Sequence, residues 1–355
     1  MGQKVGSVEF YAGPKQLGAP DDLEDVIIKF IKGAKKKLCI AVQELENENI
    51  ANAIIEARLK RKVSVEMVIE QSYLRIPKTN SDIDPWQPLK GNNEANRTIH
   101  DALLRANIDV KTDYNEYIFH QKFIIRDGKD VLTGSTNFTD TGTSKNLNHI
   151  VIVRNKPAAR VYQNEFDEIS EGNFGRLSQN REPAPKEFTV SNVPVKILFA
   201  PDHNPEMEIM KQMLKARKRI DFAIFTFAAS SGIDDTMIRL CDLDMPITGA
   251  FDGGQGVQSW AAIPALKKAG ADLYKVKKTS ALGKLHHKLM VLDDQVVIAG
   301  SFNYTGPANL LNDENIIILG DMDTTSKTKR DAQKKIASFA RREIERIIAD
   351  HGTKI

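Results

Sequence analysis

The sequence predicts an α/β fold made of two similar halves, each a β-sheet with helices packed on its faces. Two observations support this prediction: the chain of 355 residues repeats itself, and each copy alternates helical and strand-like patterns. The composition is ordinary for a globular protein, with 41% hydrophobic and 27% charged residues. These values exclude a disordered, collagen-like or disulfide-rich chain.

The net charge identifies no partner. With 50 Lys and Arg residues against 47 Asp and Glu residues it is +3, so any surface that binds nucleic acid must be local. The two cysteines, Cys39 and Cys241, show no metal-binding spacing, which favours a reducing compartment. Neither a signal peptide nor an apolar run of membrane-spanning length is visible, and we expect a soluble, cytoplasmic protein without a transmembrane segment.

The clearest repeat begins at His120 and again at His286. The stretch HQKFIIRDGKDVLTGSTN aligns without a gap with HHKLMVLDDQVVIAGSFN, at a constant offset of 166 residues. A lone histidine or a lone Gly-Ser-x-Asn is usually structural, but two complete copies indicate a shared site. Among the positions that keep their residue are His120 and His286, Lys122 and Lys288, Asp127 and Asp293, Gly134 and Gly300, Ser135 and Ser301, and Asn137 and Asn303.

Segments upstream of each motif also match. Residues 25–44 and 208–226 each contain an amphipathic helical pattern, a basic cluster and then a strand-like alternation. Residues 103–110 and 266–273 each resemble a helix end that turns into a strand. The expected order within a copy is strand, helix, strand, helix, strand, helix, strand, and then the motif with its flanking strands.

The boundary between the copies is marked by composition. A strong amphipathic helix is expected at 328–349, with 158–169 as its counterpart in the first copy. After that counterpart comes a stretch rich in Pro, Ser, Asn and Gly, which is typical of a connection. We therefore place the first half at 1–180, a linker at 181–186 and the second half at 187–355.

One polar segment, 71–97, breaks the symmetry of the repeat. The second copy has only about half as much chain at this place, and long loops of this kind often contact substrate or form lids. The alternative is a tolerated surface insertion. The side chains that it presents include Tyr73, Arg75, Lys78, Trp86 and Lys90.

The repeated residues suggest chemistry on an anionic substrate. Side chains two positions apart on a strand point to the same face, so His120 and Lys122 are expected to face one site, as are His286 and Lys288. A lysine beside a histidine supplies positive charge that can bind a phosphate oxygen. Neutral contacts to substrate are expected from the hydroxyl and amide groups of Ser135, Asn137, Ser301 and Asn303.

HxKxxxxD followed by GSxN, present twice, resembles the phospholipase D superfamily over nearly the whole chain. The resemblance implies a pseudo-twofold, bilobal monomer in which two α/β lobes, each with a mixed sheet flanked by helices, bring both motifs to one active site. It also implies cleavage or transfer of phosphodiesters with no metal and no cofactor.

The resemblance further implies roles for single residues. One histidine attacks phosphorus to give a covalent phosphohistidine, and the other protonates the leaving oxygen and then activates water or an alcohol. Family habit favours His120 as nucleophile and His286 as acid and base, while the near-symmetric sequence itself leaves the assignment open. Lys122 and Lys288 stabilise the transition state. Asp127 and Asp293 complete the catalytic motifs and are expected to support them rather than to act on substrate.

The two copies differ eleven residues after the motif asparagine. The second copy has Glu314 there and the first has Asn148. In the family an acidic residue at this place often binds a motif histidine, so Glu314 joins the candidate catalytic residues and is expected to orient either His286 or His120. Asn148 can orient a group without adding charge, and we place it among the candidate substrate-binding residues. The two histidines are thus expected to differ electrostatically.

Three functions are compatible with the motifs. The preferred one is a nuclease that acts on DNA or RNA, supported by scattered basic clusters at 35–37, 58–62, 215–219 and 275–278 and by aromatic residues that could stack on bases. The second is a phospholipase D or phosphatidyl-transferase that acts on phospholipid. The third is a non-catalytic member that binds nucleic acid or protein, against which the completeness of both motifs argues.

Overall fold

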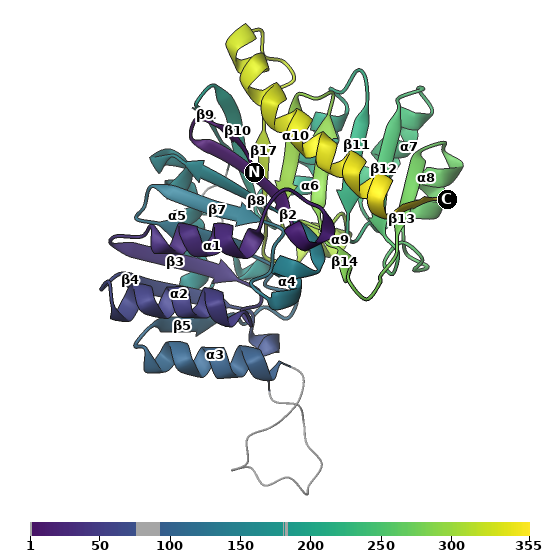
Figure 1. The fold of residues 1–355 in the computed structure, drawn as a ribbon. Helices are drawn as coiled ribbons and strands as arrows, with labels where there is room; N and C mark the ends of the chain where they lie inside the picture. Colours follow the sequence, from purple (N-terminus) through teal and green to yellow (C-terminus); the bar gives the residue numbers. More distant parts are fainter. Residues whose placement is uncertain (1, 76–92, 180, 182–183) are drawn as a thin grey trace, which may run out of the picture.

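The computed structural model describes residues 2–75, 93–179, 181 and 184–355. It contains two large mixed sheets, one from each half of the chain (Figure 1). The predicted α/β fold with two similar lobes is therefore confirmed.

The first sheet has nine strands, and its central strands carry the first motif. Strands β3, β4 and β5 are parallel, whereas the pairs β3–β6, β6–β7, β7–β8 and β8–β2 are antiparallel, and β14 pairs with β8 in parallel. Along the sheet the order is β1 (Gln3–Val5), β2 (Val8–Gly13), β8 (Asn146–Arg154), β7 (Asp130–Gly134), β6 (Lys122–Arg126), β3 (Lys37–Val42), β4 (Ser64–Ile69) and β5 (Asp109–Thr112), and the ninth strand, β14 (Lys284–Leu285), pairs with β8.

The second sheet repeats this plan, again with nine strands. Strand β14 is the exception to the separation of the halves, because it comes from the second half and pairs with β8 of the first. The order in the second sheet is β18 (Gly352–Lys354), β13 (Asp272–Val276), β12 (Ile247–Asp252), β11 (Ile220–Ile224), β15 (Lys288–Leu292), β16 (Val296–Gly300), β17 (Glu314–Leu319), β10 (Val193–Ala200) and β9 (Lys186–Val190).

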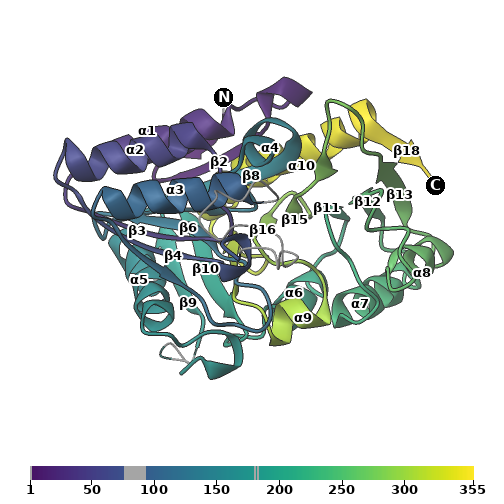
Figure 2. The ribbon, with the colours of Figure 1, turned by 90° about the horizontal axis from the view of Figure 1, so that it is seen from below.

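Helices cover the outer faces of the sheets and fill the space between them (Figures 1 and 2). The outer helices are α1 (Leu23–Lys32), α2 (Glu48–Leu59) and α3 (Glu94–Arg105) in the first half, and α6 (Pro205–Met213), α7 (Gly232–Cys241) and α8 (Ile263–Lys268) in the second. Between the sheets lie α5 (Lys156–Ser170) and α10 (Lys327–His351). Short elements complete the fold: α4 (Asp140–Ser144), α9 (Gly306–Leu310), η1 (Lys15–Leu17), η2 (Gln71–Tyr73) and η3 (Gly175–Leu177).

Local sequence explains why these helices form where they do. Helix α1 begins after Asp22, whose carboxylate accepts a hydrogen bond from the Asp25 backbone amide, and its buried residues recur at helical spacing. Helix α10 begins after Ser326, whose hydroxyl accepts from the Lys329 amide. The predicted final helix and its counterpart α5 are both present, and each buries an apolar stripe between the sheets.

The packing of α10 holds the two halves together. Its buried face includes Ile336, Ala340 and Ile344, and these belong to one apolar cluster with residues of both sheets, such as Phe10 and Phe199. Alanine at a crossing point lets a helix approach a sheet closely. The resulting core is continuous between the halves, so the relative position of the two motifs is fixed by close packing.

The parallel strands of each sheet place the motifs at one edge. Val42, the last residue of β3, pairs with Lys122, and Ile224, the last residue of β11, pairs with Lys288. The carboxyl ends of parallel strands share one edge of a sheet, which is where sites in α/β folds usually form. The described residues that directly follow β3, β4 and β5, and those that follow β11, β12 and β13, are therefore at the edge where the motifs lie.

Two expectations fall partly outside the described residues. The insertion at 71–97 begins with η2 and ends in α3, while 76–92, with Lys78, Trp86 and Lys90, lie outside the described part of the chain. The linker at 181–186 includes 182 and 183, which also lie outside it. Strand β9 begins at Lys186 and belongs to the second sheet. The residue bounds of the two halves stay a prediction.

Candidate active site

The two His-Lys pairs converge from the two halves on one buried centre. His120 is 6% exposed and His286 is 7% exposed, and the lysines that follow them are more buried still. The pKa of His286 is lowered well below its usual value, first by burial and then by Lys288, Lys122 and His120, so all four groups share one electrostatic environment. This is the convergence that the strand spacing and the repeat predict.

Each lysine folds back onto its own motif. The Lys122 ammonium donates to the carbonyl oxygen of His120 at 2.8 Å, and the Lys288 ammonium donates to that of His286 at 2.9 Å. An ammonium group has three donors, so each lysine keeps at least one for a phosphate oxygen. Lys122 uses a second donor on the side-chain oxygen of Gln43, at 3.0 Å.

The place of Gln43 is taken in the second half by an aromatic ring. The Lys288 ammonium lies 5.0 Å from the ring centroid of Phe225, and the His286 ring is at the same centroid distance of 5.0 Å from Phe225. A lysine over an aromatic face is stabilised as a cation. The two lysines therefore have different neighbours, one polar and one aromatic.

His120 is oriented by a carboxylate from the other half. Its Nδ1 lies 2.7 Å from Oε2 of Glu314, which begins β17. Donors face both oxygens of this carboxylate: the Ser301 hydroxyl contacts Oε2 at 2.6 Å and the Asn312 amide contacts Oε1 at 3.4 Å. When Glu314 is ionised, it accepts the Nδ1 proton of His120, which leaves Nε2 as the ring nitrogen with a free lone pair.

His286 is oriented by an amide from the first half. Its Nδ1 lies 2.9 Å from Oδ1 of Asn148 and 3.1 Å from the backbone carbonyl oxygen of Ser135. The Asn148 amide nitrogen donates to the carbonyl of Gly142 at 2.9 Å, so its oxygen is the atom that faces His286. Two acceptors at Nδ1 require a proton there, and Nε2 is again the reactive nitrogen. Of the two alternatives for Glu314, the structure therefore selects His120.

The motif serines contact the groups that orient the histidines. Ser135 and Ser301 are fully buried, and their hydroxyls donate to Asn148 at 2.8 Å and to Glu314 at 2.6 Å. Asn148, also fully buried, contacts His286. The role of these three residues in binding substrate stays a prediction.

The motif glycines make this arrangement possible. A Cβ on Gly134 would lie 2.3 Å from the carbonyl oxygen of His149, and one on Gly300 would lie 2.3 Å from that of Asn315. Both distances are far below van der Waals contact, and both glycines have positive φ angles, 151° and 145°. Glycine is therefore required where each motif serine turns toward the neighbouring strand.

The motif asparagines remain candidates for substrate contact. Asn137 and Asn303 are half-buried, and each has a buried side-chain oxygen without a hydrogen-bond partner among the described residues. A buried polar atom without a partner is costly, which points to a partner supplied by substrate or water. Their role as substrate-binding residues stays a prediction.

The motif aspartates lie away from the centre. Asp127 follows the five residues of β6, so it is about 16 Å from Lys122 along the strand. Its carboxylate accepts from the backbone amides of Lys35, Lys36 and Lys37, at 2.7 to 3.2 Å. Asp293 does the same for residues 217–219. Placing these aspartates in the catalytic set is therefore not supported, whereas the expected supporting role agrees with these contacts.

Burial changes the acidity of the central groups. It lowers the pKa of Lys122 to about 7, although Glu314, Glu44 and Glu70 act in the opposite direction. Burial raises the pKa of Glu314 and lowers that of His120, so these partners compete for one proton. The pKa of Lys288 is lowered by burial and by Lys122.

The surroundings of the site are unequally charged. In the first half the loops at this edge carry Glu44, Glu70 and Glu116, and they expose Tyr114 and Tyr117, which are 77% and 40% exposed. In the second half they carry three exposed lysines and a 42% exposed Trp260. These lysines are Lys277, Lys278 and Lys284.

Most of the basic clusters lie at the opposite edge. Residues 35–37, 58–62 and 215–219 precede or begin the strands β3, β4 and β11, at the ends remote from the motifs. Arg61, for example, donates to the carbonyls of Lys32 and Ala34 at the end of α1. Only 275–278 lies at the edge of the site. Tyr73 is half-buried, with its hydroxyl 3.4 Å from the Gln43 amide nitrogen.

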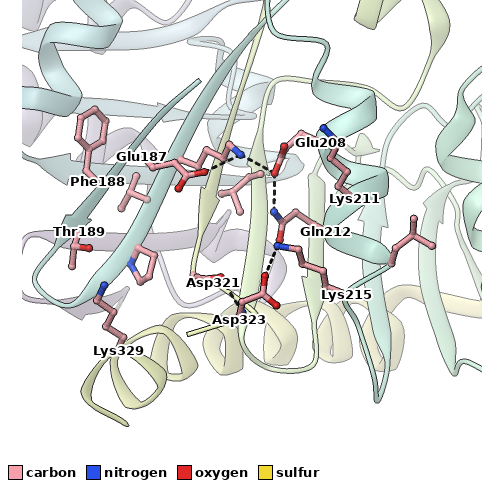
Figure 3. A pocket seen from close by; sticks show the side chains of 16 residues that line it. Glu187, Phe188, Thr189, Glu208, Lys211, Gln212, Lys215, Asp321, Asp323 and Lys329 are labelled. Carbon is pink, nitrogen blue, oxygen red and sulfur yellow. Dashed lines mark hydrogen bonds and ion pairs between the residues drawn. The ribbon is translucent and has the colours of Figure 1, made fainter. Parts of the chain in front are cut away.

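A groove elsewhere on the molecule has no evident link to this chemistry. It has a volume of ≈ 790 Å³ and lies between β9, β10, α6 and the start of α10 (Figure 3). Two of its lysines are paired with carboxylates, Lys196 with Glu208 at 3.0 Å and Lys215 with Asp323. The groove contains none of the repeated residues.

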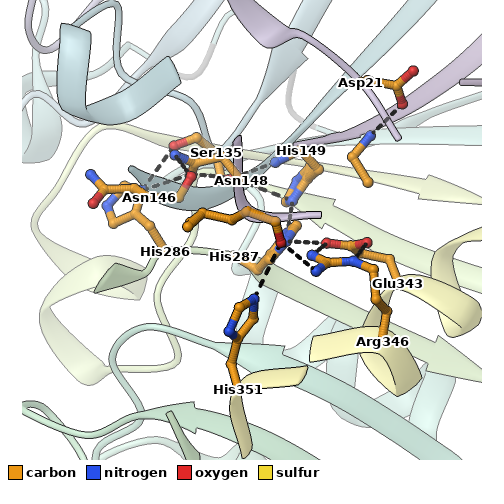
Figure 4. A network of polar contacts seen from close by, with 12 residues as sticks. Asp21, Ser135, Asn146, Asn148, His149, His286, His287, Glu343, Arg346 and His351 are labelled. Atoms are coloured by element: carbon orange, nitrogen blue, oxygen red, sulfur yellow. Dashed lines mark hydrogen bonds and ion pairs between the residues drawn. The ribbon is translucent and has the colours of Figure 1, made fainter. Parts of the chain in front are cut away.

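A second layer of buried histidines was not found from the sequence. His149 and His287 lie directly behind Asn148 and His286, and both are fully buried (Figure 4). These two histidines do not recur at the offset of the repeat, because the matching positions in the other copy are Asn315 and Gln121. A comparison by chemical role rather than by identity would have found them.

The chain has two mixed α/β halves, which together bring two His-Lys pairs to one centre. This arrangement defines a class of bilobal proteins with a duplicated motif. The chain belongs to the phospholipase D superfamily: the family described as "Cardiolipin synthase, PLD-like domain" matches residues 27–170 and 209–336. This confirms the resemblance noted in the sequence.

Several known proteins are similar to this chain. A mitochondrial cardiolipin hydrolase of Xenopus laevis is 27% identical over 139 residues, which are 39% of this chain and 57% of that protein. A phospholipase D of Rickettsia prowazekii is 27% identical over 148 residues, 41% of this chain and 62% of that protein. The chain thus matches less than two thirds of the length of either relative.

A solved structure shares the fold. The phosphatidylserine synthase of Haemophilus influenzae Rd KW20 superposes with a TM-score of 0.68 at 13% identity, covering 100% of this chain and 88% of that one. Among the helices that the structure describes, none is both long and apolar enough to span a bilayer. Location in the cytoplasm stays a prediction.

Proposed function

We propose that this chain is a phosphodiesterase that works through a covalent phosphohistidine and acts on phospholipids. The observation that carries the proposal is the crossed orientation of the two histidines, each held through Nδ1 by the other half of the chain. This leaves two Nε2 atoms to act on one phosphodiester, which is what a two-step displacement needs.

The proposed reaction begins with His120. Its Nε2 attacks phosphorus and forms a P–N bond while the bond to the leaving oxygen breaks, and Nε2 of His286 gives a proton to that oxygen. In the second step His286 takes a proton from water, the resulting hydroxide attacks phosphorus, and the P–N bond breaks. Lys122 and Lys288 stabilise the phosphoryl oxygens in both steps.

Electrostatics favours this division of roles. Phosphorylation of Nε2 leaves the ring of His120 positively charged while Nδ1 stays protonated, and the Glu314 carboxylate at 2.7 Å stabilises that charge. The neutral Asn148 gives His286 no such stabilisation, so its protonated form is the stronger acid. A strong acid is what the leaving oxygen requires.

Phospholipid is the preferred substrate because of the relatives and of the surroundings of the site. The relatives are described as cardiolipin hydrolases and phospholipases D. The surroundings combine exposed aromatic side chains with lysines on one side, and these two features suit an anionic headgroup on an apolar body.

A nuclease, the function preferred from the sequence, is the second candidate. Its support is the basic segment at the edge of the site, with Lys277, Lys278 and Lys284, which can bind a nucleic-acid backbone. The other basic clusters, at the remote edge, no longer support it.

One panel of substrates tests the proposal. Vesicles of cardiolipin and of phosphatidylcholine, single-stranded DNA, duplex DNA and RNA are incubated with the protein in EDTA at low salt. We expect release of phosphatidate from the vesicles, absent in His120→Ala. Cleavage of nucleic acid with no lipid turnover would overturn the substrate, and no His120-dependent cleavage of any of them would overturn the reaction.

A further inference from the structure

Behind the centre, a chain of polar contacts runs from one half of the molecule to the other (Figure 4). The backbone amide of Gly300 donates to Nε2 of His149 at 3.1 Å, and Nδ1 of His149 lies 3.1 Å from Nδ1 of His287. Nε2 of His287 then lies 3.6 Å from Oε1 of Glu343 on α10. All of these side chains are buried, and the mechanism above uses none of them.

The first bond of the chain fixes the proton positions of all the others. A backbone amide can only donate, so Nε2 of His149 is unprotonated and the ring proton is on Nδ1. That proton is donated to Nδ1 of His287, which places the proton of His287 on Nε2, facing Glu343. Arg346 holds Glu343 ionised with two contacts, 2.7 Å and 2.9 Å long.

The other half contains the same chain built from amides. At the matching positions, the Asn315 amide nitrogen donates to the Gln121 oxygen at 2.6 Å, and the Gln121 nitrogen donates to Glu165 on α5 at 3.3 Å. Each chain runs in the same direction, toward a carboxylate on the helix between the sheets. The two imidazoles can gain a proton, whereas the two amides cannot.

The imidazole chain is linked closely to His286. His287 is its neighbour along the strand, and His149 is the neighbour of Asn148, which binds His286. The Ser135 hydroxyl joins the two layers, because it lies 3.3 Å from Nδ1 of His149 and donates to Asn148 at 2.8 Å. Displacement of either buried ring therefore moves the groups that set the orientation of His286.

We propose that His149 and His287 are positioning residues that hold His286 in its reactive tautomer and keep the two halves in register, while the Gln121–Asn315 pair does the same for His120. This proposal rests on the proposed function for its kinetic consequences, but not for its structural ones. The proposal requires both imidazoles to be neutral. A second proton on His149 would sit on Nε2 and break the hydrogen bond that the Gly300 amide donates there.

Charged groups around the pair are few. The charges that act on the pKa of His287 are those of Glu343 and Arg346 of α10 and of Lys288 of β15, and those that act on the pKa of His149 are those of His287 and Lys288. From β2, the ring of Phe10 stacks on His149 with centroids 5.7 Å apart. Both histidines have pKa values below the usual one, chiefly because of burial. The neutral pair is thus the stable form near neutral pH.

The test uses two substitutions of His287 that differ only in hydrogen bonding. His287→Gln copies the amide of Gln121 and keeps both the acceptor and the donor, whereas His287→Leu removes both. We expect His287→Leu to lower kcat by about 10- to 100-fold with KM changed less than about threefold, and His287→Gln to restore most of kcat. His149→Phe, which keeps the stack on Phe10, should match His287→Leu, and His100→Gln on α3 serves as the control.

A second readout needs no substrate. In the folded wild-type protein, ¹⁵N spectra of the imidazoles should show His149 and His286 protonated at Nδ1 and His287 at Nε2. In His287→Gln, His286 should keep its Nδ1 proton. In His149→Phe, His286 should no longer show a single tautomer. An unchanged His286 spectrum in both folded His149→Phe and His287→Leu would overturn the proposal, whether or not the substrate panel succeeds. Unchanged kcat in these variants, with an active wild type, would overturn it as well.

Discussion

Nδ1 of His120 and Oε2 of Glu314 lie 2.7 Å apart, although 194 positions separate them in the chain. His286 and Asn148 form the opposite crossing at 2.9 Å. Neither half therefore contains a complete site, since each supplies the histidine of one pair and the orienting group of the other. The chemical difference between the pairs, a carboxylate against an amide, gives two similar histidines different roles.

Glu314→Gln should lower kcat on the order of 100-fold, because the amide cannot stabilise the charge that forms on His120. Steady-state kinetics on the substrate found in the panel measures the effect. The matched control is Glu9→Gln, a buried glutamate on β2 that pairs with Arg154 at 2.8 Å. The control should lose stability with little change in kcat, and an equal loss of kcat in both variants would reject the specific role of Glu314.

Activity should fall as the pH rises above about 7, because the pKa of Lys122 is lowered to about 7 and the uncharged amine no longer stabilises phosphate oxygens. Gln43→Glu places a negative charge at the 3.0 Å contact and should shift this alkaline limb to higher pH. Glu44→Gln removes a charge that raises the pKa of Lys122 and should shift the limb to lower pH. Profiles of kcat/KM against pH that show no opposed shifts would rule out Lys122 as the source of the limb.

Asp127→Ala should destabilise the protein by about 2 kcal/mol without a matching loss of kcat, since the carboxylate accepts from three backbone amides far from the centre. Asp127→Asn keeps an acceptor and tolerates the positive φ of 53°, so it should lose less. Urea unfolding and kinetics on the same samples separate the two effects. A kcat loss in Asp127→Ala at full stability would return this aspartate to the catalytic set.

Stability should decrease as the pH falls below about 6.5, where histidines of the unfolded chain gain protons that the buried ones do not. For each histidine with a lowered pKa, the free energy of unfolding falls by about 1.4 kcal/mol per pH unit in this range, down to the pKa of the folded state. His287→Gln should reduce the slope by about that amount, while His100→Gln should leave it nearly unchanged. Equal slopes in wild type and His287→Gln would contradict a neutral, buried His287.

Much of the fold followed from the sequence because it depends on local patterns. The helices before β3 and β11 and the alternation of His120 with Lys122 arise from periods of 3.6 and 2 residues. The crossing of Glu314 to His120 depends on how α5 and α10 pack between the sheets, which no local pattern records. The burial of Ser135 by the neighbouring strand is likewise a tertiary property, which the local sequence pattern does not record.

The network of His149 and His287 was missed for a related reason. Its counterpart, Asn315 and Gln121, shares hydrogen-bonding direction but no residue identity, so a search for repeated letters passes over it. The segment 76–92, with Trp86, lies outside the described residues, and its predicted contact with substrate stays a prediction.

In the proposed reaction, His120 carries the covalent intermediate. The most direct measurement is to mix His286→Asn and His120→Asn, each separately, with a substrate that keeps a labelled phosphoryl group, quench in alkali and map the adduct by mass spectrometry. We predict a phosphohistidine at position 120 in His286→Asn and no adduct in His120→Asn. An adduct at position 286 in His120→Asn would contradict this assignment. The absence of an adduct in both variants would also contradict it, provided that the wild-type protein is active.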